Sequence, residues 1–126
     1  MVTIIICYRN LKVVDNPGTG HAPSSSDRAT NLPLNQAADS RAWLEAMDRV
    51  LIPALQLVEP AVVILSCGFD AYHEDTVGPL CLSEDCYSVF AAKLQKFNVP
   101  VLGLLEGGYC VGALGKLAKN IIVPFL

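Results

Sequence analysis

The chain has 126 residues, a length typical of one domain, and nine basic against twelve acidic residues give it a net charge of -3. It has no basic cluster that could follow a phosphate backbone, so we expect no nucleic-acid partner. Hydrophobic residues make up 52% of the chain and charged residues only 17%, which leaves little polar surface to cover a small domain and indicates a missing neighbour.

The cysteines and the apolar stretches indicate the compartment. Cysteine occurs five times, at Cys7, Cys67, Cys81, Cys86 and Cys110. This odd number, with no secretion-signal pattern before it, predicts reduced thiols in an intracellular protein, cytoplasmic or, in a eukaryote, nuclear. The most apolar stretch, residues 50–69, is interrupted by Pro53, Glu59 and Pro60, so we expect no membrane span and a soluble protein.

The first half of the chain predicts a strand, a loop and a helix. Residues 2–7 (VTIIIC) are β-branched and apolar on both faces, which predicts a buried parallel strand. Residues 15–28 are rich in proline, glycine and serine and predict a loop, and residues 30–34 predict a short strand. A helix capped by Asp39 follows, with Pro53 expected to bend it. Its apolar stripe consists of Leu44, Met47, Leu51, Leu55 and Val58.

The second half alternates strand and helix. Residues 61–65 and 99–105 are apolar on both sides and predict buried strands, Ser83 begins a helix that runs to about residue 97, and helical spacing returns from Ala113 to Ile122. We therefore expect one α/β domain over residues 1–126, a three-layer sandwich in which helices cover a mainly parallel sheet. Ligands of such a sheet bind beyond the carboxyl ends of its strands.

Two unusual loops fall at that edge. Asp70 follows the first of the two buried strands, and Gly107, Gly108 and Tyr109 follow the second, so the loops should be neighbours. The carboxylate of Asp70 is a candidate metal ligand. The two glycines let a ligand approach the backbone closely, and the phenol of Tyr109 can donate a hydrogen bond to a developing oxyanion.

These residues also resemble a known family. The segments SCGFDAYHEDTVGPLCLS (66–83) and LLEGGYCVGAL (104–114) are similar to the C-terminal motifs of the zinc-dependent histone deacetylase and acetylpolyamine amidohydrolase superfamily. Three further segments, NPGTG (16–20), NLPL (31–34) and VLIPALQLVEP (50–60), resemble it in the same order. The resemblance implies a partial arginase/deacetylase-like fold, with the amino-terminal half of the family domain missing, and hydrolysis of acetyl-lysine or acetylpolyamine amides.

The resemblance also implies roles for individual residues. Asp70 would be a zinc ligand, Tyr109 would polarise the acetamide carbonyl, and Gly107 and Gly108 would lie against the substrate. The family takes its other two zinc ligands from an Asp-x-His segment and its proton-transfer histidines from a His-His pair. Neither motif occurs here, where His21 and His73 are the only histidines. Because catalytic zinc needs three protein ligands, we expect the chain to be inactive alone.

Two functions from different classes follow. In the first, the chain is the C-terminal part of a zinc deacetylase that a complementing upstream segment or an oligomer completes. In the second, it is a catalytically silent deacetylase-like remnant that acts by binding. A nucleotide-binding domain ranks third, because Pro23 stands where the third glycine of a dinucleotide fingerprint would follow Gly18 and Gly20.

Some side chains allow a second interpretation. His73, three residues after Asp70, is a conceivable replacement ligand, but we favour an exposed loop histidine. Cys67, Cys81 and Cys86 could form a soft-metal set with it, yet they lack Cys-x-x-Cys spacing and have apolar neighbours. We interpret them as buried structural thiols.

Overall fold

The computed structural model describes residues 2–6, 11–12, 32 and 34–126, and describes side chains for residue 32 and residues 34–126. Its sheet is mixed and has the strand order β2-β1-β3-β4. The strands are β1 (Val2–Ile6), β2 (Leu11–Lys12), β3 (Val63–Cys67) and β4 (Val101–Leu105). β3 and β4 are parallel, whereas β1 is antiparallel to both β2 and β3.

The antiparallel β1 corrects one prediction. Residues 2–6 do form a strand, but Val2 pairs with Cys67 and Ile5 with Ile64, so the expected parallel direction is wrong. A β-branched run predicts extended backbone, and only the connection between strands decides their relative direction. The loop predicted over residues 15–28 lies outside the described residues. Of the strand predicted over residues 30–34, the described Leu32 and Leu34 belong to no strand.

The first helical segment contains a π-helical turn. It consists of α1 (Ser40–Ala46), the π-helical η1 (Met47–Leu51) and α2 (Ile52–Val58). As predicted, Asp39 caps α1, where the Ala42 N–H donates to Asp39 Oδ1 at 2.9 Å. Pro53 has no N–H to donate to the carbonyl four residues earlier. Just before Pro53 the helix widens into the π-helical turn, in which the Ile52 N–H donates to Met47 O, five residues back.

The second half follows the predicted alternation. β3 leads through a long loop to α3 (Glu84–Gln95), which Ser83 begins as predicted, and β4 is followed by α4 (Val111–Ile122) and a 3-10 turn (Val123–Phe125). β3 starts and ends two residues later than predicted, and α3 ends two residues earlier. Within the described residues, every helix is too short or too polar to cross a bilayer.

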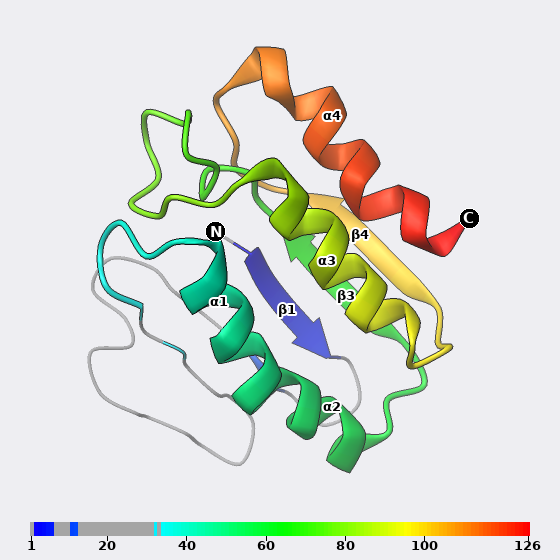
Figure 1. The fold of residues 1–126 in the computed structure, drawn as a ribbon. Helices are drawn as coiled ribbons and strands as arrows, with labels where there is room; N and C mark the ends of the chain where they lie inside the picture. Colours follow the sequence, from blue (N-terminus) through cyan, green and yellow to red (C-terminus); the bar gives the residue numbers. More distant parts are fainter. Residues whose placement is uncertain (1, 7–10, 13–31, 33) are drawn as a thin grey trace.

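In the described part of the chain, α1, α2 and α3 cover one face of the sheet. Figure 1 shows α1, α2 and α3 in front of the strands, and α4 packs against α3. The covered face carries Val63, Leu65 and Cys67, which are buried in one continuous core. Trp43 of α1 meets Phe90 of α3 edge-on, with ring centroids 5.0 Å apart. Among the described residues one helix layer and one sheet layer are therefore present, two of the three layers expected.

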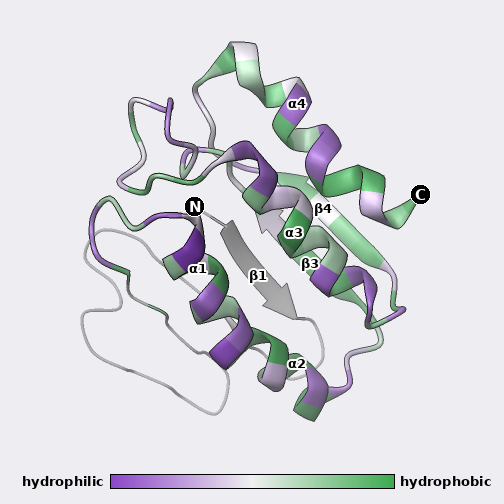
Figure 2. Ribbon diagram, viewed as in Figure 1, coloured by the Kyte–Doolittle hydropathy of each residue, from purple (hydrophilic) through white to green (hydrophobic). Residues whose placement is uncertain are grey.

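The opposite face leaves β4 exposed. The register pairs Leu102 with Ile64 and Leu104 with Ser66, which places both leucines on that face, and they are 53% and 46% exposed. β4 ends the sheet, so among the described strands nothing pairs with its outer edge. Figure 2 shows the apolar colouring along this edge strand. The sequence predicted a strand buried on both sides, but among the described residues β4 is half-buried only at Val101 and is exposed on both faces from Leu102 to Leu105.

Candidate active site

The loops after β3 and β4 meet at the carboxyl edge of the sheet, as predicted. The Phe69 N–H donates to Gly107 O at 2.8 Å, and the Glu106 N–H donates to Cys67 O at 3.0 Å. These two bonds continue the parallel pairing beyond the ends of the strands. The two loops therefore begin side by side.

The Asp70 carboxylate lies against the backbone of the second loop. A Cβ placed on Gly107 would be 3.0 Å from Asp70 Oδ2 and 3.2 Å from its Cγ, so any side chain at Gly107 would press on the carboxylate. Gly108 has a φ of +127° and a Cβ there would be 2.9 Å from the Cβ of Phe69. Only glycine combines this backbone angle with so close an approach.

Asp75 fixes the start of the Tyr109 segment. Its Oδ2 accepts the N–H of Tyr109 at 2.6 Å and that of Cys110 at 3.1 Å, and its Oδ1 accepts those of Val77 at 2.9 Å and Gly78 at 3.4 Å. Burial alone would raise the pKa of this carboxyl, but the four N–H donors outweigh burial and hold the pKa below its ordinary value. One carboxylate thus binds the two loops together.

Gly78 packs against the backbone of Asp70. A Cβ on Gly78 would overlap the backbone carbonyl of Asp70, so the long loop folds back and packs directly against the Asp70 turn. Beside it, the ring of Phe69 contacts the buried ring of Tyr87 with centroids 5.3 Å apart. At the other loop the Ser66 hydroxyl donates to the Glu106 carboxylate, which anchors the residue before the glycine pair.

The predicted site residues divide into two groups. Asp70, Gly107 and Gly108 are brought together, with Asp70 half-buried. The Tyr109 backbone is held by Asp75, while its side chain is 58% exposed at the rim of the site. His73 is exposed, with Nδ1 3.3 Å from Leu82 O and its ring edge-on to Tyr72, as expected of a loop histidine.

The donor set fits one ligand position of a metal site. Asp70 offers a carboxylate at the ligand-binding edge of the sheet. However, the described part of the chain nowhere brings three histidine, cysteine, aspartate or glutamate residues together. Catalytic zinc takes three protein ligands, so the described residues by themselves do not form such a site.

The thiols do not change this conclusion. Cys67 and Cys86 are buried, as predicted, and burial raises the pKa of each thiol to about 11, which keeps both neutral. Cys81 is exposed, so its prediction as a buried thiol is wrong. It lies in the extended stretch before α3, where alternate side chains face solvent. Cys7 lies outside the described residues.

Sequence reasoning missed the residues that hold the loops. Asp75 and Gly78 do have a recognisable signal, because an aspartate that bonds the N–H two residues on forms an Asx turn and glycine commonly follows such a turn. The pair Ser66 and Glu106 had no signal, since the two residues are forty positions apart and only the register of β3 and β4 brings them together.

Comparison with known proteins agrees with this geometry. Residues 8–123 match the histone deacetylase domain model. The chain is 34% identical over 113 residues to an uncharacterized protein from Synechocystis sp., covering 87% of this chain and 37% of that one. It is 39% identical over 88 residues to Histone deacetylase 5 from Arabidopsis thaliana, covering 68% of this chain and 13% of that one.

A solved structure shares the fold. The acetylpolyamine aminohydrolase from Burkholderia pseudomallei superposes with a TM-score of 0.77 at 23% identity, covering 86% of this chain and 33% of that one. The α/β class and the arginase/deacetylase-like fold expected from the sequence are confirmed. The chain spans about a third of the length of this structure and of the Synechocystis protein. By the family-model match and these relatives, the chain belongs to the histone deacetylase family.

Proposed function

We propose that this chain forms the C-terminal part of a zinc-dependent deacetylase site that hydrolyses acetyl-lysine or acetylpolyamine amides when further polypeptide completes it. The observation that carries the proposal is the contact between the two loops, in which the Asp70 carboxylate packs against Gly107 two residues before Tyr109. Membership of the histone deacetylase family and the acetylpolyamine in the name of one solved structure of the same fold support the substrate class.

Each candidate site residue has a defined role in this proposal. Asp70 would hold the metal, and bound zinc would draw electron density from the acetyl oxygen. Tyr109 would donate its phenolic proton in a hydrogen bond to that oxygen as negative charge develops. Gly107 lets the backbone of the second loop lie directly against the Asp70 carboxylate, and both glycines would lie against the substrate. The products are acetate and a free amine, and the base that takes the proton of water comes from outside the described residues.

We infer that the completing polypeptide packs on β4. The outer edge of this strand and the side chains of Leu102, Leu104 and Leu105 are exposed in the described structure. β4 ends just before Gly107, so a strand paired parallel to it would bring its own carboxyl-end residues to this edge of the sheet. The 52% hydrophobic composition agrees with a surface that is covered in the complete protein.

A chimera tests the deacetylase proposal. This chain replaces the matching 113 residues of the Synechocystis relative, and release of acetate from an acetyl-lysine peptide and from an acetylpolyamine is measured with zinc. We expect turnover by the chimera, a loss of about 100-fold or more on Tyr109→Phe, and none by the chain alone. A folded chimera without turnover, or turnover that survives Tyr109→Phe, would contradict the proposal.

The second candidate, a catalytically silent binding module, rests on a separate observation. The described residues bring no three metal-ligating side chains together, and they expose an apolar strand. The same chimera separates the two functions, because a silent module assembles with the rest of the domain without restoring turnover.

A further inference from the structure

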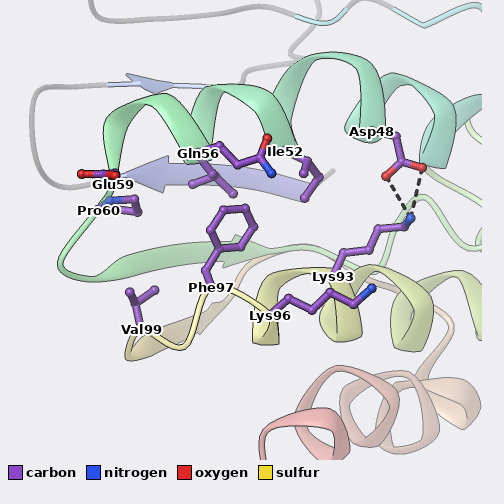
Figure 3. A pocket seen from close by; sticks show the side chains of 10 residues that line it. Asp48, Ile52, Gln56, Glu59, Pro60, Lys93, Lys96, Phe97 and Val99 are labelled. Carbon is purple, nitrogen blue, oxygen red and sulfur yellow. Dashed lines mark hydrogen bonds and ion pairs between the residues drawn. The ribbon is translucent and has the colours of Figure 1, made fainter.

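A groove of about 570 Å³ opens at the opposite edge of the sheet from Asp70. It lies between α2 and the end of α3, and Pro60 and Val99, which precede β3 and β4, close it on the strand side (Figure 3). Its volume falls in the range of small-molecule sites, about 300–1,000 Å³. This groove is separate from the candidate active site and does not depend on the deacetylase proposal.

The floor of the groove is apolar. Leu55 is fully buried beneath it and Pro60 is buried beside it, while Ile52, Phe97 and Val99 are half-buried along its length. In Figure 3 the Phe97 ring stands in the middle of the groove, below Gln56. A ligand with an aliphatic or aromatic body would remove this surface from water, which is the main favourable term for such a site.

The two ends of the groove carry opposite charge. At one end Lys93 Nζ lies 2.9 and 3.0 Å from the two carboxylate oxygens of Asp48, so each neutralises the other. Lys96 extends toward that end in Figure 3 and makes no ion pair within the described part of the chain. Two lysines against one aspartate leave a net charge of +1 there. Glu59 stands at the far end beside Pro60.

The position of Glu59 is held by an unfavourable backbone conformation. It ends α2 with a φ of 47°, in the left-handed region where glycine or asparagine is the common residue. The carboxylate is therefore placed at this end at a conformational cost. A ligand carboxylate would be repelled by Glu59 and attracted by Lys96, so the charges define one orientation.

From these observations we propose that the groove binds a small apolar carboxylic acid. The body of the acid lies on Leu55 and Phe97, and its carboxylate accepts a hydrogen bond from the Lys96 ammonium. Lys93 stays paired with Asp48 and closes that end of the groove. A charge-assisted hydrogen bond of this kind gives about a tenfold or larger preference for the anion over a neutral analogue.

The test compares three ligands of the same apolar body. The full chain is titrated with octanoate, 1-octanol and octylamine, and backbone amide NMR shifts report both affinity and location. We expect octanoate to shift the amides around Ile52 and Phe97, with octanol and octylamine at least about tenfold weaker. Lys96→Glu should weaken octanoate binding about tenfold or more, while Lys119→Glu, at another exposed lysine, on α4 outside the groove, should leave it unchanged.

Three results would overturn the proposal. Octylamine or octanol binding as tightly as octanoate would exclude a carboxylate site. An unchanged octanoate affinity in Lys96→Glu would exclude the assigned partner, and shifts confined to the exposed face of β4 would exclude the groove. Both lysines are exposed, so circular dichroism of the two variants should match that of the parent and confirm that each is folded.

Discussion

The carboxylate of Asp75 accepts the backbone N–H of Tyr109 at 2.6 Å, across thirty-four positions of sequence. The same carboxylate accepts three further N–H groups, two of them from its own loop. The loop that carries Asp70 and the loop that carries Tyr109 therefore share one anion. The proposed site depends on this connection for its geometry, although Asp75 itself touches none of the reacting groups.

Replacing Asp75 should change how stability depends on pH. Its pKa in the folded chain is held below the ordinary 3.8, so the unfolded chain binds more protons in acid. Its contribution is fully present above about pH 5 and is lost as the pH falls below about 4. We expect Asp75→Asn to cost about 1–2 kcal/mol in the free energy of unfolding near pH 7, with the difference from the parent shrinking as the pH falls below 3.8.

Urea unfolding at several pH values measures this difference. Asp85→Asn, an exposed aspartate in the first turn of α3, is the control, and its difference from the parent should stay below about 1 kcal/mol at every pH. A cost for Asp75→Asn that stays constant between pH 7 and 3 would show that the four hydrogen bonds do not depend on the ionised carboxylate.

Gly78 should tolerate no side chain. A Cβ there overlaps the Asp70 carbonyl, whereas a Cβ on Gly103 has no atom within 4 Å. We expect Gly78→Ala to cost about 2 kcal/mol or more in the free energy of unfolding, because backbone must move, and Gly103→Ala to stay within about 0.5 kcal/mol. Equal effects of the two substitutions in denaturant unfolding would refute the close packing beneath Asp70.

The buried hydroxyl of Tyr87 should contribute nothing to the stability of the core. Its Oη is buried without a hydrogen-bond partner among the described residues, and burial raises the pKa of the phenol. Tyr87→Phe keeps the ring contact with Phe69, so we expect stability unchanged or up to about 1 kcal/mol higher. Tyr87→Leu, which removes that contact, should be destabilising. A loss of more than 1 kcal/mol in the Phe variant would reveal a partner for the hydroxyl.

Leu104 should respond differently in the chain alone and in the completed protein. It is half-exposed here, so Leu104→Glu should change the unfolding free energy of the chain by no more than about 0.5 kcal/mol. In the chimera, where we expect β4 to be covered, the same substitution buries a charge and should prevent folding. Leu57→Glu on α2, at 87% exposure, is the control and should fold in both settings. A well-folded Leu104→Glu chimera would place the completing polypeptide elsewhere.

Local signals in the sequence predicted the elements well. The cap at Asp39, the start of α3 after Ser83 and the strand before Gly68 are set by residues within a few positions of each other. The direction of β1 and the exposure of β4 were not predictable in this way. Both depend on which segments lie beside a strand, and an apolar strand has the same sequence whether or not its neighbour is present.

In the candidate site, too, features set by nearby residues were predicted and features set by distant residues were not. Asp70, Gly107 and Gly108 were predicted because each follows an apolar strand, and such loops meet at one edge of a parallel pair. Asp75, Gly78 and the Ser66–Glu106 hydrogen bond serve the same site from distant positions, and only the folded register shows it. The π-helical turn before Pro53 is a further example, since proline predicts a lost hydrogen bond but not how the helix accommodates it.

Zinc content tests the central claim most directly, because the account gives this chain one ligand position and assigns the others to completing polypeptide. After zinc loading and exhaustive dialysis, metal analysis should find one zinc per chimera, almost none in the chimera with Asp70→Ala, and almost none in the chain alone. One zinc retained by the chimera despite Asp70→Ala, or one retained by the chain alone, would contradict the account.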